Sequence, residues 1–287
     1  MLTVCRPTLV KRVQPGKTSI AFLLGGLLSI LSAVSQAGLL QLTGSFTQGG
    51  LIMGRTEPGA RLTLDGQTVR VSPTGAFVLG FDRDAPASAR LEATFQNGSR
   101  EQRILTIKPR RYPIQRINGL PAEQVTPPPE VMERIQREKA QLQEARSRTI
   151  DTAYFLSGFT WPVKGRISGV FGSQRILNGE PRQPHYGIDI AATAGTPVEA
   201  PADGVVTLAQ PNLYFTGGTL IVDHGYGLNS AFAHLQEIYV KPGQPVTQGQ
   251  TIAAVGATGR ASGPHLHWGM NWLTRHLDPA LLLTPLP

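Results

Sequence analysis

Glycine and proline interrupt this chain so often that long helices are possible in only a few places. There are 32 glycines and 23 prolines among 287 residues, about a fifth of the chain against roughly an eighth in average proteins. Many of them separate short runs rich in apolar and β-branched residues, which is the pattern of strands joined by turns. Hydrophobic residues reach 40%, so wholesale disorder, a collagen rod, a coiled coil and a multi-span membrane protein are excluded. We therefore expect a mainly β protein.

The first 37 residues have the three parts of a secretory signal peptide. A basic stretch ending at Lys17 precedes an apolar run from Ile20 to Val34, and Ser35-Gln36-Ala37 is a small-x-small cleavage site. The alternative is a retained membrane anchor, but this run of 15 residues is short beside the ~20 needed to span a bilayer. We predict export and cleavage after residue 37. Because the only cysteine, Cys5, lies in this segment, the exported part would have neither a disulfide nor a lipid-attachment cysteine.

The net charge of +8 at first suggests an anionic partner such as nucleic acid. However, residues 1–37 contain four basic residues and no acid, so the remainder has 23 basic against 19 acidic residues. The remainder also contains no Lys/Arg-rich block and no RNA-binding motif. We therefore predict no nucleic-acid partner, and contact with the membrane only through the signal peptide.

Residues 38–111 have the pattern of a small β-sandwich, Ig-like in outline. Short alternating runs flank Asp65-Gly66, which is a strong hairpin signal, and a second pair of runs flanks Asn97-Gly98. Six or seven strands in about 70 residues are typical of such a module.

A linker and a helix are expected next. Residues 112–129 end in three prolines and predict a linker without strands or helices. Residues 130–151 lack Gly and Pro and predict a spacer helix. Its thin apolar stripe favours packing of one edge on a domain over a long coiled coil. Three Glu-to-Arg pairs at the supporting spacing are Glu130/Arg134, Glu133/Arg137 and Glu144/Arg148.

A second β domain is predicted from residue 159 to residue 287, and it contains two histidine motifs. The first runs from His185 to Asp189, and the second is His265-Leu266-His267. Gly187 and its β-branched neighbours favour an extended first motif. Positions two or four apart on a strand share a face, so each motif should project its polar side chains together. Two imidazoles and a carboxylate form the ligand set of a catalytic zinc, whose fourth position holds water.

The second domain contains a series of short motifs in addition to the two histidine motifs. They are Trp161-Pro162-Val163, Phe171-Gly172, the His185 to Asp189 segment, Gly195-Thr196-Pro197-Val198, Ala233-His234-Leu235, Gly256-Ala257-Thr258-Gly259 and Ser262-Gly263-Pro264-His265-Leu266-His267. With these motifs the domain resembles the lysostaphin-type, or LytM-like, zinc metallopeptidases, which cut peptide bonds in bacterial peptidoglycan. The resemblance implies an antiparallel β peptidase domain with one zinc per chain and a zinc-bound water as nucleophile. It assigns the metal ligands to His185, Asp189 and His267 and the catalytic roles to His234 and His265.

The resemblance implies an exported, periplasmic zinc metalloendopeptidase that hydrolyses peptide cross-links in peptidoglycan. Its partners would be peptidoglycan stem peptides and cell-envelope regulators. One alternative is a non-catalytic scaffold of the same fold that activates a cell-wall amidase, although such relatives usually lack some metal ligands. A second alternative is a lipoyl- or biotinyl-type carrier domain. That carrier needs an exposed lysine at a hairpin tip, and no lysine lies between Lys164 and Lys241.

Several other residues carry weaker expectations. Phe232 stands where many relatives have tyrosine, which we expect to remove a hydroxyl from the cleft. His224 should make structural hydrogen bonds, and His276 should be a surface or turn residue. Arg175 and Arg182 precede His185 and either steer an acidic stem peptide or form a solvated loop. The tryptophans expected in the core are Trp161, Trp268 and Trp272.

Overall fold

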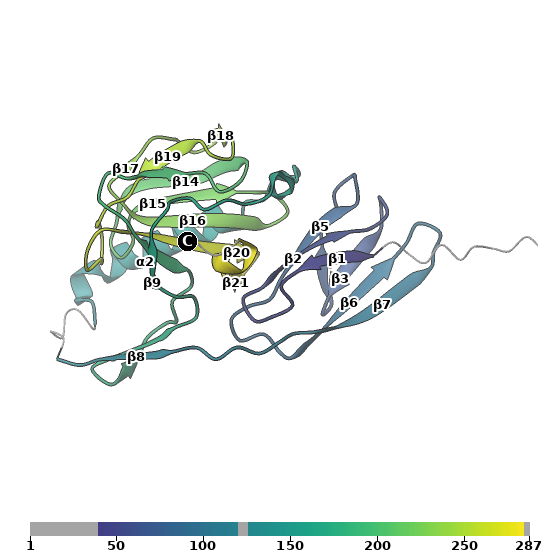
Figure 1. The fold of residues 1–287 in the computed structure, drawn as a ribbon, viewed down its shortest axis with the longest axis horizontal. Helices are drawn as coiled ribbons and strands as arrows, with labels where there is room; N and C mark the ends of the chain where they lie inside the picture. The colour runs from purple at the N-terminus through teal and green to yellow at the C-terminus, as the bar shows by residue number, and fades with distance from the viewer. Residues whose placement is uncertain (1–39, 120–125, 284–287) are drawn as a thin grey trace, which may run out of the picture. The chain divides into compact units, whose positions relative to one another are not determined.

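The computed structural model describes residues 40–119 and 126–283. The predicted signal peptide lies outside the described residues. The expectation of a mainly β protein is confirmed, since most of the regular structure is strand (Figure 1). None of the helices in the described ranges is long and apolar enough to cross a membrane.

Residues 40–111 form two antiparallel sheets around a shared hydrophobic core, with Leu62, Phe77 and Leu91 almost fully buried. The predicted hairpin turn at Asp65-Gly66 is present, and both residues have a positive φ. The Ig-like description of this module remains a prediction. One sheet contains, in order, β1 (Gln41–Gly44), β2 (Leu51–Arg55) and β5 (Ala76–Gly80), and the other contains β4 (Gln67–Val69), β3 (Arg61–Leu64), β6 (Ser88–Thr94) and β7 (Arg100–Thr106).

The predicted linker contains a strand, so the expectation of a strand-free segment at 112–129 was wrong. Strand β8 (Ile114–Ile117) pairs in parallel with β10 (Gln174–Leu177), whose other neighbour is β11 (Glu180–Pro181). The partner of β8 lies about 60 residues further along the chain, so a local reading of the prolines could not reveal it. As an edge strand, β8 tolerates the proline that precedes it.

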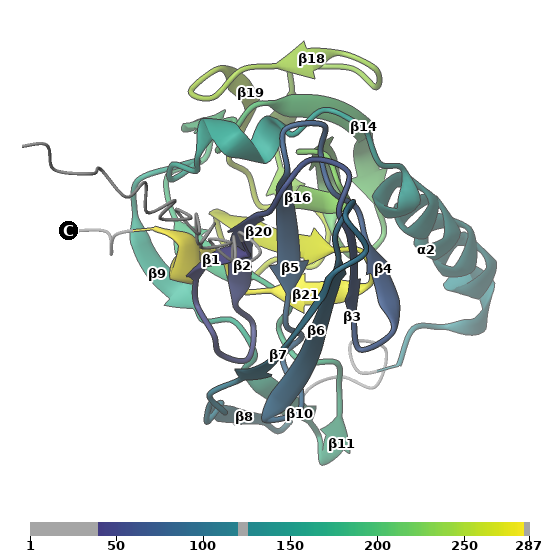
Figure 2. The same cartoon turned by 90° about the vertical axis from the view of Figure 1, so that its right-hand side faces the viewer.

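One α-helix follows in the described part of the chain, within the predicted range. Helix α2 (Met132–Ser147) begins after the short helix η1 (Pro129–Val131). Its one buried residue, Ala145, packs with Leu208, Ile221 and Ala231 of the second domain, so the helix packs by one edge, as its thin stripe indicated (Figure 2). The predicted pairs Glu133/Arg137 and Glu144/Arg148 are present, whereas Arg134 pairs with Glu138 instead of Glu130.

The second domain is built on a large antiparallel sheet with the order β18-β14-β15-β16-β20-β12-β9, and β21 pairs with β20. A smaller sheet has the order β13-β19-β17. The bounds are β9 (Arg166–Gly169), β12 (Ile188–Ala191), β13 (Pro197–Glu199), β14 (Gly204–Leu213), β15 (Gly217–Asp223), β16 (Leu228–Leu235), β17 (Glu237–Ile238), β18 (Pro245–Val246), β19 (Thr251–Ala254), β20 (His265–Trp272) and β21 (Arg275–Leu277), with short helices η2 (Tyr154–Ser157) and η3 (Pro279–Leu282).

Alternation along β20 separates the core from an open face. Leu266 and Trp268 are fully buried, while His265 and His267, which alternate with them along the strand, are partly exposed and lie on the opposite face. Phe232 on β16 lies directly opposite Trp268 and is also fully buried. A tyrosine hydroxyl at 232 would therefore lie in the core, so the expectation that phenylalanine there removes a hydroxyl from the cleft was wrong.

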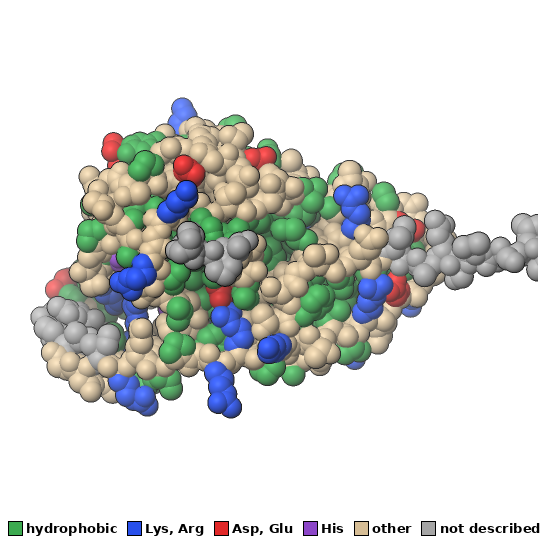
Figure 3. All heavy atoms as spheres, viewed as in Figure 1, with side chains coloured by type: hydrophobic (Ala, Val, Ile, Leu, Met, Phe, Trp, Pro, Cys, Tyr) green, Lys and Arg blue, Asp and Glu red, His purple; other side chains and the backbone are tan. Residues whose placement is uncertain are grey.

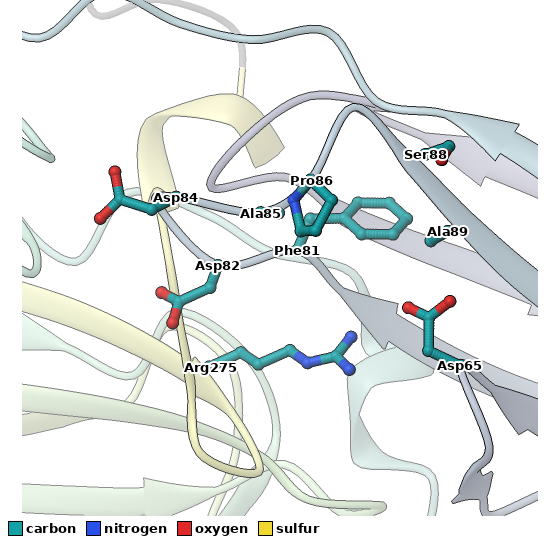
Figure 4. Close-up of a pocket in the computed structure, with 9 residues that line it drawn as sticks. All are labelled: Asp65, Phe81, Asp82, Asp84, Ala85, Pro86, Ser88, Ala89 and Arg275. Atoms are coloured by element: carbon teal, nitrogen blue, oxygen red, sulfur yellow. The ribbon is translucent and has the colours of Figure 1, made fainter.

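A hollow near the first module lies apart from these histidines. Arg275 is drawn in it between Asp82 and Asp65 (Figure 4). The Arg275 guanidinium donates to the carbonyl of Gly80 at 2.8 Å and to the Gln67 side chain at 3.3 Å. These bonds give Arg275 a structural role in attaching β21 to strand β5.

Candidate metal centre

Antiparallel pairing of β12 with β20 brings the two histidine motifs together. Asp189 lies opposite His267, and Ala191 lies opposite His265. The first motif is only partly a strand, because β12 begins at Ile188 and His185 lies in the preceding loop. The prediction of an extended segment was therefore wrong at His185, although its side chain does meet Asp189.

Three potential ligand atoms converge at this point of the sheet. Nε2 of His185 lies 2.9 Å from Oδ1 of Asp189 and 3.0 Å from Nδ1 of His267, and the last two atoms are 2.9 Å apart. A tetrahedral zinc with bonds of 2.0–2.1 Å needs ligand atoms ~3.3 Å apart. A small outward movement of the side chains would therefore admit the ion. The predicted ligands His185, Asp189 and His267 form a cluster able to hold a metal.

The hydrogen bonds of His185 show that the cluster suits a cation. Nδ1 of His185 lies 3.0 Å from the carbonyl oxygen of Val170, which can only accept, so Nδ1 carries the ring proton. In the neutral imidazole, the Nε2 lone pair then faces the carboxylate oxygen of Asp189. Two acceptors this close repel each other unless a positive charge lies between them. Such a histidine, with its second nitrogen bonded to a backbone carbonyl, is the usual form of a metal ligand.

The protonation states also favour metal binding. Burial alone would raise the pKa of Asp189, but the hydrogen bonds that His185 and His267 donate to it when no metal is bound, together with the positive charge of these rings, hold that pKa well below its usual range. Burial lowers the pKa of His267. The centre therefore offers a charged carboxylate and a neutral imidazole at ordinary pH, which are the forms that coordinate metals.

His234 reaches the centre through a distortion of β16. Phe232 pairs with Leu220 and Leu235 pairs with Gly218, so Ala233 and His234 together face only Thr219. This bulge places His234 in the left-handed region, with φ +62°, and bulges of this kind redirect side chains near active sites. The motif predicted a role for His234, but nothing in the sequence indicated the backbone conformation.

The two predicted catalytic histidines share one orientation. Nδ1 of His234 donates to the carbonyl of Thr258 at 2.8 Å, and Nδ1 of His265 donates to the carbonyl of Gly263 at 2.8 Å. In both rings Nε2 is then the free basic nitrogen. The ring centroids lie 4.7 Å apart, and Nε2 of His265 lies 3.9 Å from Oδ1 of Asp189. Burial lowers the pKa of His234 to about 4, so this ring is neutral near pH 7.

Residues of the first module support the loop that carries His185, and sequence reasoning did not anticipate them. The backbone N–H of Gly172 donates to the carbonyl of His185 at 2.8 Å. The Arg83 Nε donates in turn to the carbonyl of Gly172 at 2.8 Å, and its guanidinium lies 4.4 Å from the Tyr112 ring centroid. Gly172 has φ +79°, and a Cβ there would collide with the Tyr112 ring. The first module is therefore linked by hydrogen bonds, through the backbone of Gly172, to the backbone of His185 and not to its ligand side chain.

The other histidines and the tryptophans discussed from the sequence lie outside the metal cluster and make packing or hydrogen-bond contacts. His224 is fully buried and is bonded at Nδ1 to the Asp203 carbonyl and at Nε2 to the Ser230 hydroxyl, which confirms its structural role. The prediction for His276 was wrong, because it lies in β21, stacks on Tyr186 and bonds to Asn271. The core prediction holds for Trp268 and Trp272, and Trp161 packs edge-on against Trp268.

An Asp–His–His cluster able to hold a metal, with two further imidazoles of fixed tautomer beside it, is the arrangement found in metal-dependent hydrolases. Comparisons with known proteins identify the family. The model for peptidase family M23 matches residues 183–279. A crystal structure described as a putative peptidase M23 from Pseudomonas aeruginosa is 31% identical, with 82% of this chain and 94% of that chain covered and a TM-score of 0.64. The chain belongs to peptidase family M23.

Two curated relatives match over shorter stretches. The peptidoglycan DD-endopeptidase ShyA of Vibrio cholerae is 42% identical over 111 residues, which are 38% of this chain and 26% of that protein. The cell division protein DipM of Caulobacter vibrioides is 36% identical over 131 residues, which are 44% of this chain and 21% of that protein. The chain thus spans about a quarter of the length of these relatives.

Proposed function

We propose that this protein is a zinc-dependent endopeptidase that hydrolyses peptide cross-links in bacterial peptidoglycan. The observation that carries the proposal is the convergence of His185, Asp189 and His267 beside the free Nε2 atoms of His234 and His265. The similarity to a relative named as a peptidoglycan DD-endopeptidase supports the choice of substrate. We also propose one zinc per chain and export to the periplasm with removal of residues 1–37.

The three ligands and the two imidazoles divide the chemistry between them. Zinc bound to His185, Asp189 and His267 would polarise the scissile carbonyl and lower the pKa of a water to ~7. Nε2 of His234 and Nε2 of His265 have the free lone pairs that accept the proton of the attacking water and return it to the leaving amine. The backbone carbonyls of Thr258 and Gly263 hold these rings in the required tautomer.

A non-catalytic scaffold of the same fold is the alternative. Such a protein would not need a complete ligand set, and it would not need two further imidazoles with both tautomers fixed. This chain has every one of these groups, which supports the enzyme over the scaffold.

Two variants test the division of roles. His267→Ala removes one of three ligands, so we expect loss of zinc and of peptidoglycan cleavage together. His234→Ala leaves the ligand set whole, so zinc should stay bound while turnover falls by about 10²–10⁴. Zinc per chain and cleavage rate should be measured side by side. A His234→Ala protein without zinc, or a His267→Ala protein that keeps zinc and activity, would show that the proposed roles are wrong.

A further inference from the structure

Two arginines lie on the hairpin that borders the metal centre. Arg175 is in β10, and its Nη2 lies 3.9 Å from Oδ2 of Asp189. Arg182 follows β11, and its backbone N–H donates to the carbonyl of Arg175 at 2.9 Å. This pairing holds Arg182 beside Arg175 at the rim of the centre.

A third arginine extends the rim on the side of His234. Arg260 comes two residues after Thr258, whose carbonyl holds the ring of His234. The Arg260 backbone N–H donates to the carbonyl of Phe215, and its guanidinium lies 4.6 Å from the Phe215 ring centroid. Burial lowers the pKa of Arg260, and the positive charges of Arg175 and Arg182 lower it further. Arg260 therefore borders the centre on the side of His234, and the charges of Arg175 and Arg182 act on its guanidinium.

The metal centre has fewer acidic side chains than are needed to pair with these three arginines. In the described ranges, the one ion pair found for Arg175 is with Asp189, and a bound metal would also draw on that carboxylate. Nε of Arg182 is buried and has no hydrogen-bond partner among the described residues. A buried guanidinium donor without an acceptor is costly. The arginines of the rim therefore have fewer acidic partners than positive charges among the described residues.

We propose that Arg175, Arg182 and Arg260 bind a carboxylate of the substrate peptide close to the scissile bond. This inference rests on the proposed function and specifies its substrate as an acidic peptide. Guanidinium groups suit the role because their planar donors match a carboxylate in a two-point hydrogen bond. On the face drawn in Figure 3, blue side chains lie beside a small area of exposed histidine.

The test uses two synthetic cross-linked peptides that differ only in whether the carboxylates beside the cross-link are free or amidated. The proteins compared are the wild type, Arg182→Gln, Arg260→Gln and the charge-matched control Arg137→Gln, whose side chain on α2 is 69% exposed. Arg175 is left intact because it contacts a metal ligand. We expect the wild type and the control to favour the free carboxylates about tenfold through KM. Each rim variant should lose most of that preference.

A second readout separates this inference from the proposed function. Binding of the same two peptides, carrying a fluorescent label, to the metal-free proteins should show the same order of preference without any cleavage. Cleavage of both peptides with equal KM, or an undiminished preference in both rim variants, overturns the carboxylate site and leaves the enzyme intact. If the wild type cleaves neither peptide, the proposed function fails, and binding to the metal-free proteins alone then decides whether the rim recognises carboxylates.

Discussion

The glycine in the first histidine motif should be required for metal binding, because the sheet leaves no room for a side chain there. A Cβ at Gly187 would lie 2.7 Å from Cε1 and 2.8 Å from Nε2 of His267, and 2.6 Å from the Trp268 carbonyl oxygen. Ordinary contact begins at 3.4 Å, so the His267 ring must move by about 0.6–0.7 Å. Metal–ligand distances tolerate only about ±0.2 Å. We expect Gly187→Ala to weaken zinc binding by about 10- to 100-fold, which is roughly 1.4–2.7 kcal/mol.

Competition with a chromophoric chelator measures this loss directly. The matched control is Gly263→Ala, since a Cβ at Gly263 meets nothing within 4 Å although the residue lies two positions before His265. Thermal melting of the metal-free proteins shows whether each variant folds. If folded Gly187→Ala binds zinc within twofold of the wild type, steric support of His267 by this glycine is refuted.

Two further predictions concern stability and the support of the centre. Burial lowers the pKa of His224 to about 4, so its neutral form stabilises the fold above pH 6.5, and up to roughly 3 kcal/mol is lost as the pH falls from 6.5 to 4. Burial raises the pKa of Asp223 to about 6, so protonation of this carboxyl stabilises the fold as the pH falls and partly offsets the loss at His224. The effect of His224 is therefore isolated by measuring the difference in unfolding free energy between wild type and His224→Gln from pH 7 to pH 4. A difference that does not change with pH contradicts this cause. Arg83→Met removes the hydrogen bond to Gly172, and we expect several-fold weaker zinc binding and faster amide exchange around the His185 loop. Unchanged exchange and affinity would show that the first module does not support the centre.

The sequence singled out the three residues that cluster at the candidate metal centre, His185, Asp189 and His267, but not how the fold brings them together. Both histidine motifs are recognisable in the sequence, and the alternation of side chains along a strand predicted that His265 and His267 share a face. The pairing of Asp189 with His267 joins residues 78 positions apart, and only the family resemblance indicated it. The left-handed backbone conformation of His234 could not be predicted from the sequence, because it results from a bulge in the pairing of β16 with β15.

The other features that the sequence did not predict also depend on contacts between residues far apart in the chain. Strand β8 owes its existence to β10, and His276 is ordered by Tyr186 and Asn271. Arg83 looked like any loop arginine, since its acceptor lies 89 residues away at Gly172. Local sequence patterns therefore predicted the strand-rich segments and the helix, whereas the residues that hold the metal centre in place could be identified only from the tertiary structure.

The most direct test of the account is digestion of purified cross-linked muropeptides by the chain starting at Gly38, with mass analysis of the products and zinc measured in the same samples. The account predicts that cross-linked dimers are converted to monomers with the gain of one water, that a chelator stops the conversion, and that stoichiometric zinc restores it. Dimers that stay intact while the protein holds one zinc per chain, or cleavage that continues at full rate after exhaustive removal of the metal, would contradict it.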